Sequence, residues 1–204
     1  MSGWIIKVRP QGAHAVASLI SPEGESKACA RLHEPGSGAA VGRPIIYVDL
    51  DETLIHHKLS DILKMKLRQG RVRPHAAAFL ERLRAIGDVI ILSAGTPDYI
   101  PRALELAGLL HAVDGWSSAL QRVYIRGALH DAPIRAGDRP WVLIDNQHPN
   151  DEFAEAKLEI INPGGRTPDH YIQVAEFLGE DDDVLHHLVP LVFSVLQRQR
   201  VDQS

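Results

Sequence analysis

Cysteine and long apolar runs are nearly absent from this chain of 204 residues. Cys29 is the single cysteine, which excludes both a disulfide framework within the chain and a cage of thiolate metal ligands. The apolar part of the N-terminal stretch covers only positions 4–6, which is too short for the hydrophobic core of a secretory signal. The most apolar late stretch, 184–196, contains two histidines and a proline and stays far below the ~18 apolar residues of a membrane span. We therefore expect no membrane segment and a cytoplasmic location.

Neither sign of charge is in large excess. The chain has 22 Lys and Arg against 26 Asp and Glu, which gives a formal net charge of −4. This balance argues against a protein that coats nucleic acid, although it is compatible with a local basic patch. Hydrophobic residues make up 45% of the chain, enough at this length to bury the core of one domain with a small appendage.

The N-terminal segment differs from the rest of the chain. Short strand-like runs at 4–8, 14–20 and 27–32 are followed by a linker rich in Gly, Pro and Ala. We predict a small β-rich appendage with its linker at 1–43, and a main domain at 44–204.

Apolar runs and helical patterns alternate through the main domain. Candidate strands lie at 45–48, 89–92, 123–125, 141–144 and 158–161, and candidate helices lie at 76–86, before Gly108, at 169–178 and at 182–197. The strands are nearly continuously apolar, as in sheets that are covered on both faces. The alternation therefore predicts an α/β fold with a central parallel sheet between layers of helices.

Polar side chains follow three of the candidate strands. They are Asp49, Asp51 and Thr53 after the first strand, Ser93 after the second, and Asp145 and Asn146 after the third. Because parallel strands present their carboxyl ends at one edge of the sheet, where ligands bind, we expect these side chains to converge. Asp145 and Asn146 supply hard oxygen ligands of the kind that Mg²⁺ prefers. The sequence therefore predicts a site for a cation and a phosphoryl group.

The other polar residues suit the hydrolysis of a phosphate monoester. Asp49 can act as a nucleophile that forms an aspartyl-phosphate, if a divalent ion offsets the repulsion between two anions. Asp51 can protonate the leaving oxygen and later activate water. Ser93 and Thr53 are candidate phosphate-binding residues, and the Thr53 hydroxyl can also fix the turn.

The connection between the first strand and its helix, at 53–73, is longer than the usual ~2–6 residues. Its second half, 64–73, contains five bases and no acid. If Gln69-Gly70 forms a two-residue turn, bases on the two arms lie opposite each other, which is unfavourable. Two interpretations remain open: a solvated hairpin with charges on its edge, or a surface that attracts anions. Both predict a small flap hairpin at about 54–73.

Five short motifs give the chain a resemblance to a known family. Asp49-Leu50-Asp51-Glu52-Thr53-Leu54 resembles the first motif of the haloacid dehalogenase superfamily. The other four resemble one branch of it, the phosphatases of the RNA polymerase II C-terminal domain, also called NLI-interacting-factor-like phosphatases. They are Arg73-Pro74-His75, Ile91-Leu92-Ser93-Ala94-Gly95 with Pro97-Asp98-Tyr99, Ile144-Asp145-Asn146, and Asp181-Asp182-Asp183-Val184-Leu185.

The resemblance implies a Rossmannoid three-layer sandwich with a small flap instead of a large cap. It also implies Mg²⁺-dependent hydrolysis of phosphomonoesters through a phosphoaspartate, with Asp49 as nucleophile and Asp51 as general acid and base. The metal would be held by the Asp49 carboxylate, the Asp51 backbone carbonyl and the side chains of Asp145 and Asn146. Members of this branch act on phosphoserine or phosphothreonine, so the implied partner is a phosphorylated protein.

One feature of the family is missing from its usual place. The third motif supplies a Lys that offsets phosphate charge, and no Lys lies between Lys66 and Lys157. Arg126 is the first candidate replacement, with Arg135 second and His130 third. Arg is chemically suitable because it stays charged and binds phosphate as a fork.

Three functions are compatible with these observations. The first is a phosphatase that acts on phosphorylated protein. The second applies the same chemistry to a nucleic-acid 3′-phosphate and is motivated by the basic segment 64–73. The third is a binding module that lost catalysis together with the third-motif Lys. The adjacent pairs His56-His57 and His186-His187 lack the usual i, i+4 ligand spacing, so we expect no histidine metal site.

Overall fold

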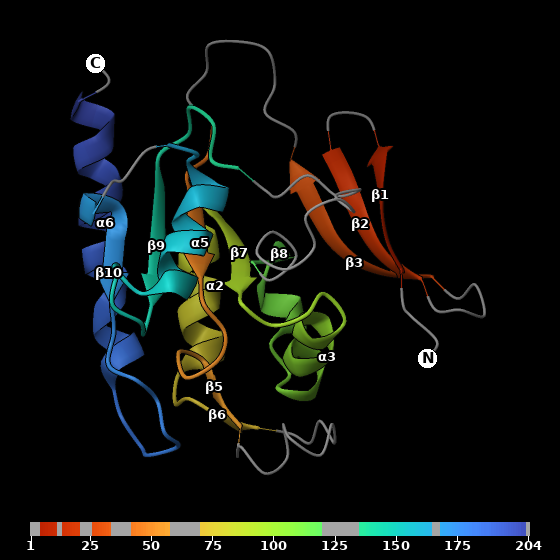
Figure 1. The fold of residues 1–204 in the computed structure, drawn as a ribbon, viewed down its shortest axis with the longest axis horizontal. Coiled ribbons are helices and arrows are strands. Elements are labelled where there is room, and N and C mark those ends of the chain that lie inside the picture. Colours follow the sequence, from red (N-terminus) through yellow and green to blue (C-terminus); the bar gives the residue numbers. More distant parts are fainter. Residues whose placement is uncertain are drawn as a thin grey trace.

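The central element of the fold is a five-stranded parallel sheet with the strand order β10-β9-β4-β7-β8 (Figure 1). The computed structural model describes residues 5–11, 14–20, 26–33, 42–57, 70–119, 135–164 and 168–202. The strands of this sheet are β4 (Ile45–Val48), β7 (Asp88–Ser93), β8 (Gly115–Ser118), β9 (Trp141–Asp145) and β10 (Tyr171–Gln173). The helices are α2 (Ala76–Ile86), α3 (Tyr99–Leu106), α5 (Glu152–Ile161) and α6 (Val184–Asp202), with short 3-10 turns η1 (Leu110–Ala112) and η2 (Pro168–His170).

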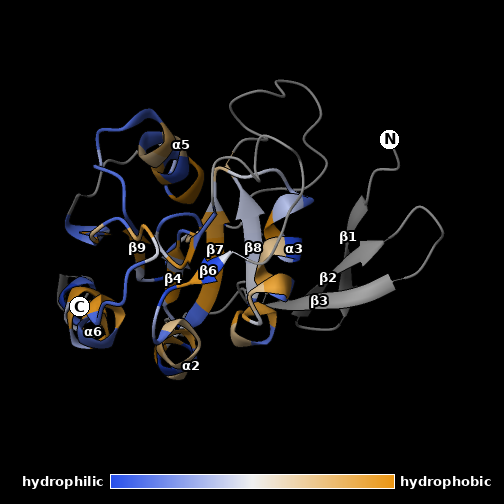
Figure 2. Ribbon diagram, turned by 90° about the horizontal axis from the view of Figure 1, so that it is seen from below, coloured by the Kyte–Doolittle hydropathy of each residue, from blue (hydrophilic) through white to orange (hydrophobic). Residues whose placement is uncertain are grey.

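Strand β4 lies in the middle of the sheet and is completely buried along its length. Its side chains alternate between two cores, as the geometry of a strand requires. Ile46 and Val48 pack into the core formed with α2, α3 and α6, whereas Ile45 and Tyr47 pack into the core formed with α5. Figure 2 shows α5 on one side of the sheet and α2 and α6 on the other. The predicted three-layer α/β fold class is therefore confirmed.

The candidate strand at 158–161 is wrong, because these residues form the last turns of α5. The helix begins after Asp151, whose Oδ1 accepts a hydrogen bond from the Phe153 backbone N–H at 3.0 Å. Ala154, Leu158 and Ile161 then recur at helical spacing on the buried face. A short apolar run does not by itself distinguish a buried strand from a buried helical segment. The candidate strand at 123–125 lies outside the described residues.

The candidate helix at 169–178 is also wrong. This segment forms η2, strand β10 and an extended stretch. Residues 171–173 pair in parallel with 143–145 of β9, and the Val174 backbone N–H donates to the Asp145 carbonyl at 2.9 Å. Pairing with a distant strand thus decides the conformation of a segment whose local pattern is ambiguous. The second C-terminal helix, predicted at 182–197, is confirmed as α6.

The described part of the flap is a small antiparallel pair of β5 (Ile55–His56) and β6 (Arg71–Val72). Ile55 pairs with Val72 and His56 pairs with Arg71. The proposed turn at 69–70 and the bases before it lie largely outside the described residues, so the predicted hairpin register stays a prediction there.

A separate three-stranded antiparallel sheet occupies the start of the chain (Figure 1). Its strands are β1 (Ile5–Gln11), β2 (His14–Ile20) and β3 (Ser26–His33), close to the three predicted runs. Within the part of the chain that the structure describes, no helix has the length and apolar character needed to cross a membrane.

Candidate active site

The first-motif residues occupy a tight turn directly after β4. The Leu54 and Ile55 backbone N–H groups both donate to the Leu50 carbonyl, at 2.9 and 3.0 Å. Glu52 has a φ of 56°, a left-handed conformation that residues other than glycine seldom adopt. Its carbonyl accepts a hydrogen bond from the Phe177 backbone N–H at 2.6 Å. The turn is thus closed by local hydrogen bonds and is also bonded to Phe177, which is distant in the sequence.

Arg73, from the Arg-Pro-His motif, supports the same turn. Its side chain is 1% exposed, and its Nη1 donates to the Thr53 carbonyl at 3.2 Å. Its Nε lies 2.9 Å from Asp182 Oδ2, and the guanidinium stacks over the Phe177 ring at 5.4 Å. A buried cation with a carboxylate and a carbonyl as partners is satisfied electrostatically. Arg73 and Asp182 therefore connect two of the family-like motifs.

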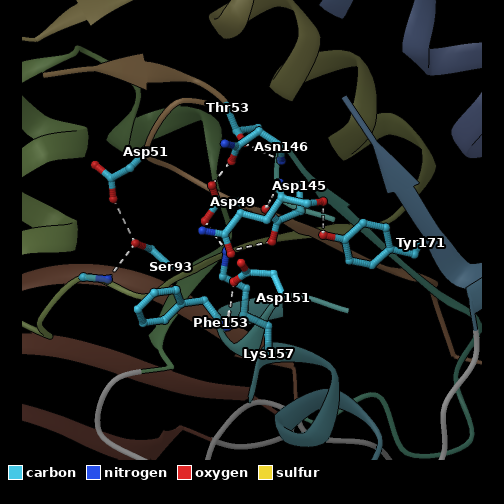
Figure 3. Close-up of polar contacts among 12 residues, drawn as sticks. Asp49, Asp51, Thr53, Ser93, Asp145, Asn146, Asp151, Phe153, Lys157 and Tyr171 are labelled. Carbon is cyan, nitrogen blue, oxygen red and sulfur yellow. Dashed lines mark hydrogen bonds and ion pairs between the residues drawn. The ribbon is translucent and has the colours of Figure 1, made fainter. Parts of the chain in front are cut away.

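The sheet register brings the predicted side chains to one edge. Val48 pairs with Ile144 on β9 and with Ile91 on β7, and the Asp49 backbone N–H donates to the Ile144 carbonyl at 2.9 Å. The strand order reverses between β4 and β9, and a reversal of this kind opens a crevice at the carboxyl ends of the strands. Figure 3 shows Asp49, Asp145 and Asn146 together, with Asp51 turned toward Ser93. The expected convergence is therefore present.

Lys157 is a site residue that the sequence did not reveal. Its Nζ donates to Asp49 Oδ1 at 2.6 Å and to Asp145 Oδ2 at 2.7 Å, and its side chain is 2% exposed (Figure 3). It reaches the crevice from α5 and follows Asp145 in the sequence, whereas the three candidates expected for this cation precede Asp145. Of the three candidates for this cation, Arg135 is exposed, and Arg126 and His130 lie outside the described residues. A lysine at helical spacing among Ala154, Leu158 and Ile161 is the signal that could have revealed it.

The three buried charges carry one surplus negative charge. Burial raises the pKa of Asp49, and the Lys157 ammonium opposes this rise. Burial and the Asp49 carboxylate raise the pKa of Asp145 to about 6, again opposed by Lys157. Burial by itself lowers the pKa of Lys157, but the two carboxylates outweigh burial and raise it. The ammonium therefore stays protonated, and the surplus negative charge favours binding of a further cation.

The oxygen atoms beside Asp49 fit the Mg²⁺ ion that the family implies. One end of the Asn146 amide lies 3.3 Å from Asp49 Oδ2 and 3.3 Å from the Asp51 backbone carbonyl, and with its nitrogen at that end the amide donates to both oxygens. The Asp49 carboxylate, the Asp51 carbonyl and the Asn146 amide therefore lie together after β4. Clustered hard oxygens are the ligands that Mg²⁺ prefers. Among the described residues, no group of three or more His, Cys, Asp or Glu side chains is placed to hold a metal ion, so a cation at Asp49 would depend on the Asn146 amide and the Asp51 backbone carbonyl as well.

Thr53 orients the Asp49 carboxylate. Its fully buried hydroxyl donates to Asp49 Oδ2 at 3.0 Å and accepts from the Asn146 backbone N–H at 3.2 Å. These bonds join the first motif to the fourth. The predicted role of Thr53 in fixing the turn has direct partners here, whereas its role in phosphate binding stays a prediction.

Asp51 lies in a second group of side chains, in which its partners Ser93 and Tyr99 are neutral hydrogen-bond donors. Ser93 Oγ donates to Asp51 Oδ2 at 3.1 Å and accepts from the Gly95 backbone N–H at 2.9 Å. The Tyr99 hydroxyl donates to Asp51 Oδ1. Burial raises the pKa of Asp51, and the hydrogen bonds from Tyr99 and Ser93 oppose the rise. In this structure the Ser93 hydroxyl therefore contacts the Asp51 carboxylate, and its role in phosphate binding stays a prediction.

The comparison with protein families agrees with the motifs. Residues 44–109, which contain the first motif, the Arg-Pro-His element and the second motif, match the family of NLI interacting factor-like phosphatases. This match agrees with the family resemblance predicted from the sequence. The matched family consists of phosphatases, which is the class of enzyme that the motifs predict. No curated protein matches the chain.

Solved structures of similar proteins include two of RNA polymerase II CTD phosphatase Fcp1. One is a variant of the fission yeast protein bound to beryllium fluoride, with 15% identity, a TM-score of 0.35, and coverage of 78% of this chain and 51% of that chain. The other has 17% identity, a TM-score of 0.37, and coverage of 78% and 49%. The chain thus spans about half the length of these relatives. Both likenesses are weak, so the fold is established by the strand order and register.

Proposed function

We propose that this protein is a Mg²⁺-dependent phosphomonoesterase that works through an aspartyl-phosphate and acts on phosphoserine or phosphothreonine in proteins. The observation that carries this proposal is the contact of Lys157 with both Asp49 and Asp145, next to the Asn146 amide and the Asp51 carbonyl. A buried nucleophilic carboxylate, a fixed cation and a set of metal ligands are what phosphoryl transfer between two anions requires.

In the first step, an Asp49 oxygen attacks phosphorus and the bond from phosphorus to the leaving oxygen breaks. Asp51, protonated at the start, gives its proton to the leaving oxygen, so an alcohol departs and Asp51 becomes a carboxylate. In the second step, Asp51 removes a proton from water while the water oxygen attacks phosphorus. The Asp49–phosphorus bond breaks, phosphate leaves, and both carboxyl groups return to their starting state.

The residues around these two carboxyls have separate tasks. Lys157 offsets the negative charge that builds up as phosphate approaches Asp49. Thr53 orients the Asp49 carboxylate, and Ser93 can exchange its bond from Asp51 to a phosphoryl oxygen. A Mg²⁺ ion held by Asp49, the Asp51 carbonyl, Asp145 and Asn146 would neutralise the repulsion between carboxylate and phosphate.

Three observations favour a protein substrate and an active site over the alternatives. Of the five bases at 64–73, Arg71 lies 3.1 Å from Asp181 and Arg73 is buried against Asp182, so both have acidic partners instead of free anion-binding positions. This weakens the case for a nucleic-acid 3′-phosphate. The binding-module alternative was motivated by a missing lysine, and Lys157 supplies a lysine at the nucleophile. The flap segment 54–73 is also far shorter than a domain of ~50 residues, which leaves room for a macromolecule.

The test is release of phosphate from p-nitrophenyl phosphate by the purified chain. We expect turnover with Mg²⁺, loss of turnover in excess EDTA, and recovery when Mg²⁺ is added back. Asp49→Asn keeps the shape of the side chain and should lower turnover by at least ~10³-fold, because a neutral amide oxygen is a far weaker nucleophile than a carboxylate. Turnover that persists in Asp49→Asn would rule out the phosphoaspartate route.

The substrate class is tested on the active protein. Phosphoserine and phosphothreonine peptides should have higher kcat/KM values than a 3′-phosphorylated oligonucleotide. The opposite order, with rates that fall as salt rises, would favour the nucleic-acid alternative.

A further inference from the structure

Tyr99 is the one residue of the Asp51 group that has no role in the proposed function. It is the first residue of α3, it is partly buried, and its hydroxyl donates to Asp51 Oδ1. The other carboxylate oxygen, Oδ2, accepts from Ser93 Oγ. The two oxygens of Asp51 therefore have different partners, from two different elements.

The Tyr99 ring occupies space that is free because residue 95 is a glycine. A Cβ atom at Gly95 would lie 2.4 Å from Tyr99 Cδ1, 2.9 Å from Tyr99 Cε1 and 3.2 Å from Ser93 Oγ. Such distances are far inside normal van der Waals contact, so any side chain at Gly95 would displace the ring. On another side, the His57 ring meets the Tyr99 ring edge-on with centroids 5.9 Å apart. The ring is therefore placed between the second-motif loop and the flap.

The two hydroxyls differ in what they can do once substrate is present. Ser93 ends β7 at the crevice, and its single proton can move to a phosphoryl oxygen. That exchange leaves Asp51 Oδ2 without a partner and able to carry the catalytic proton. Tyr99 keeps its bond to Oδ1 whether Asp51 is ionised or protonated, since a protonated carboxyl still has an accepting oxygen.

We infer that Tyr99 is a positioning residue that fixes Asp51 through Oδ1 and leaves Oδ2 as the oxygen that exchanges protons with the leaving group and with water. This inference rests on the proposed role of Asp51. It extends that role by naming the proton-carrying atom and the group that holds it. It also explains the glycine at position 95, because a side chain there would occupy the space of the Tyr99 ring that reaches Asp51.

The leaving group supplies a readout that a purely structural role would not change. Protonation by a general acid matters most when the leaving oxygen is basic and little when the departing anion is stable on its own. Phenyl phosphate and p-nitrophenyl phosphate differ in this respect and little in size. The value of kcat/KM reports the first phosphoryl transfer, in which Asp51 acts as the acid.

Tyr99→Phe keeps the ring and removes the hydroxyl. We expect kcat/KM to fall by about 10-fold or more for phenyl phosphate and by less than about 3-fold for p-nitrophenyl phosphate. Gly95→Ala displaces the ring and keeps the hydroxyl, so it should show the same dependence on the leaving group. Tyr171→Phe is the matched control: it removes a hydroxyl that donates to the Gln147 carbonyl at 2.9 Å, and its effect should be equal for both substrates.

Each outcome decides between the possibilities. A larger loss with phenyl phosphate in either Tyr99→Phe or Gly95→Ala, with circular dichroism unchanged, supports the role of Tyr99. Equal losses with both substrates, or no loss, overturn it while the proposed phosphatase function stands. A wild-type protein that releases no phosphate from either substrate with Mg²⁺ overturns the proposed function and this inference together.

Discussion

The two carboxyls of the first motif, Asp49 and Asp51, lie in one turn but have opposite surroundings. Asp49 contacts a buried ammonium, Lys157, which is shared with a second carboxylate, Asp145. Among the described residues, the Asp51 carboxylate accepts hydrogen bonds from the neutral hydroxyls of Ser93 and Tyr99. Burial raises the pKa of both carboxyls, and the rise is opposed by the Lys157 ammonium at Asp49 and by the hydrogen bonds from Tyr99 and Ser93 at Asp51.

The difference follows the proposed chemistry. A nucleophile must stay ionised throughout the approach of phosphate, and a fixed cation favours that single state. A general acid and base must gain and lose a proton in every cycle, which neutral hydroxyls tolerate because they bond to both forms. One part of the site is therefore built on charge and the other on neutral hydrogen bonds, and the two parts should respond differently to substitution.

The largest effect is expected for Lys157→Met. The substitution leaves Asp49 and Asp145 buried without their cation, and removing one partner of a buried ion pair costs about 3–5 kcal/mol. Urea unfolding in EDTA at pH 8 measures this loss, and turnover should fall by at least about 100-fold. Adding Asp145→Asn to the same variant restores the original net charge, so part of the stability should return without activity. A Lys157→Met protein as stable as the wild type would show that the charged part is not held together by this ammonium.

A smaller effect is expected for Ser93→Ala in the neutral part. The Gly95 backbone N–H loses its acceptor, which should lower the free energy of unfolding by about 1–3 kcal/mol. The loss of a donor near the phosphate should lower kcat by about 10- to 100-fold. Ser118→Ala is the matched control, since Ser118 Oγ donates to the Gly95 carbonyl at 2.5 Å. It should cost similar stability and little activity, and equal losses of activity in both variants would contradict a role for Ser93 at the reacting group.

The smallest effect concerns Glu52, which lies in the turn between the two parts. Burial, followed by the charges of Asp51, Asp49 and Glu176, raises its pKa from 4.5 to about 7. Because the folded pKa exceeds the unfolded one, protonation of Glu52 favours the folded state. This contribution is complete below pH 4.5 and is lost as the pH rises through about 7.

Glu52→Gln removes this titration. In EDTA, the urea midpoint of the wild type should fall more between pH 5 and pH 8 than the midpoint of the variant does. Glu81→Gln, on the exposed face of α2, is the control and should follow the wild type. Urea midpoints that change with pH in the same way in Glu52→Gln and the wild type would show that the pKa of Glu52 is not raised in the folded state.

Local sequence was sufficient for the first-motif turn and for the strands that carry it. Four apolar residues followed by Asp-x-Asp-x-Thr predict a buried strand that ends in a polar turn, and β4 with Asp49 and Thr53 matches this expectation. For segments with ambiguous patterns, the conformation depends on residues outside the segment. Residues 158–161 are helical because Asp151 starts a helix before them, and residues 171–173 are a strand because β9 offers an unpaired edge.

The sequence by itself determined the chemical identity of the site: which carboxyls end which strands, and that they meet at one edge of a parallel sheet. Only the tertiary structure decided which partners those carboxyls have. Lys157 is 108 residues from Asp49, and Tyr99 is 48 residues from Asp51. Periodicity reports which face of a segment is buried, but contacts between distant side chains depend on how helices and loops pack over the sheet. That is why Lys157, a lysine on an apolar helix face, becomes the partner of Asp49.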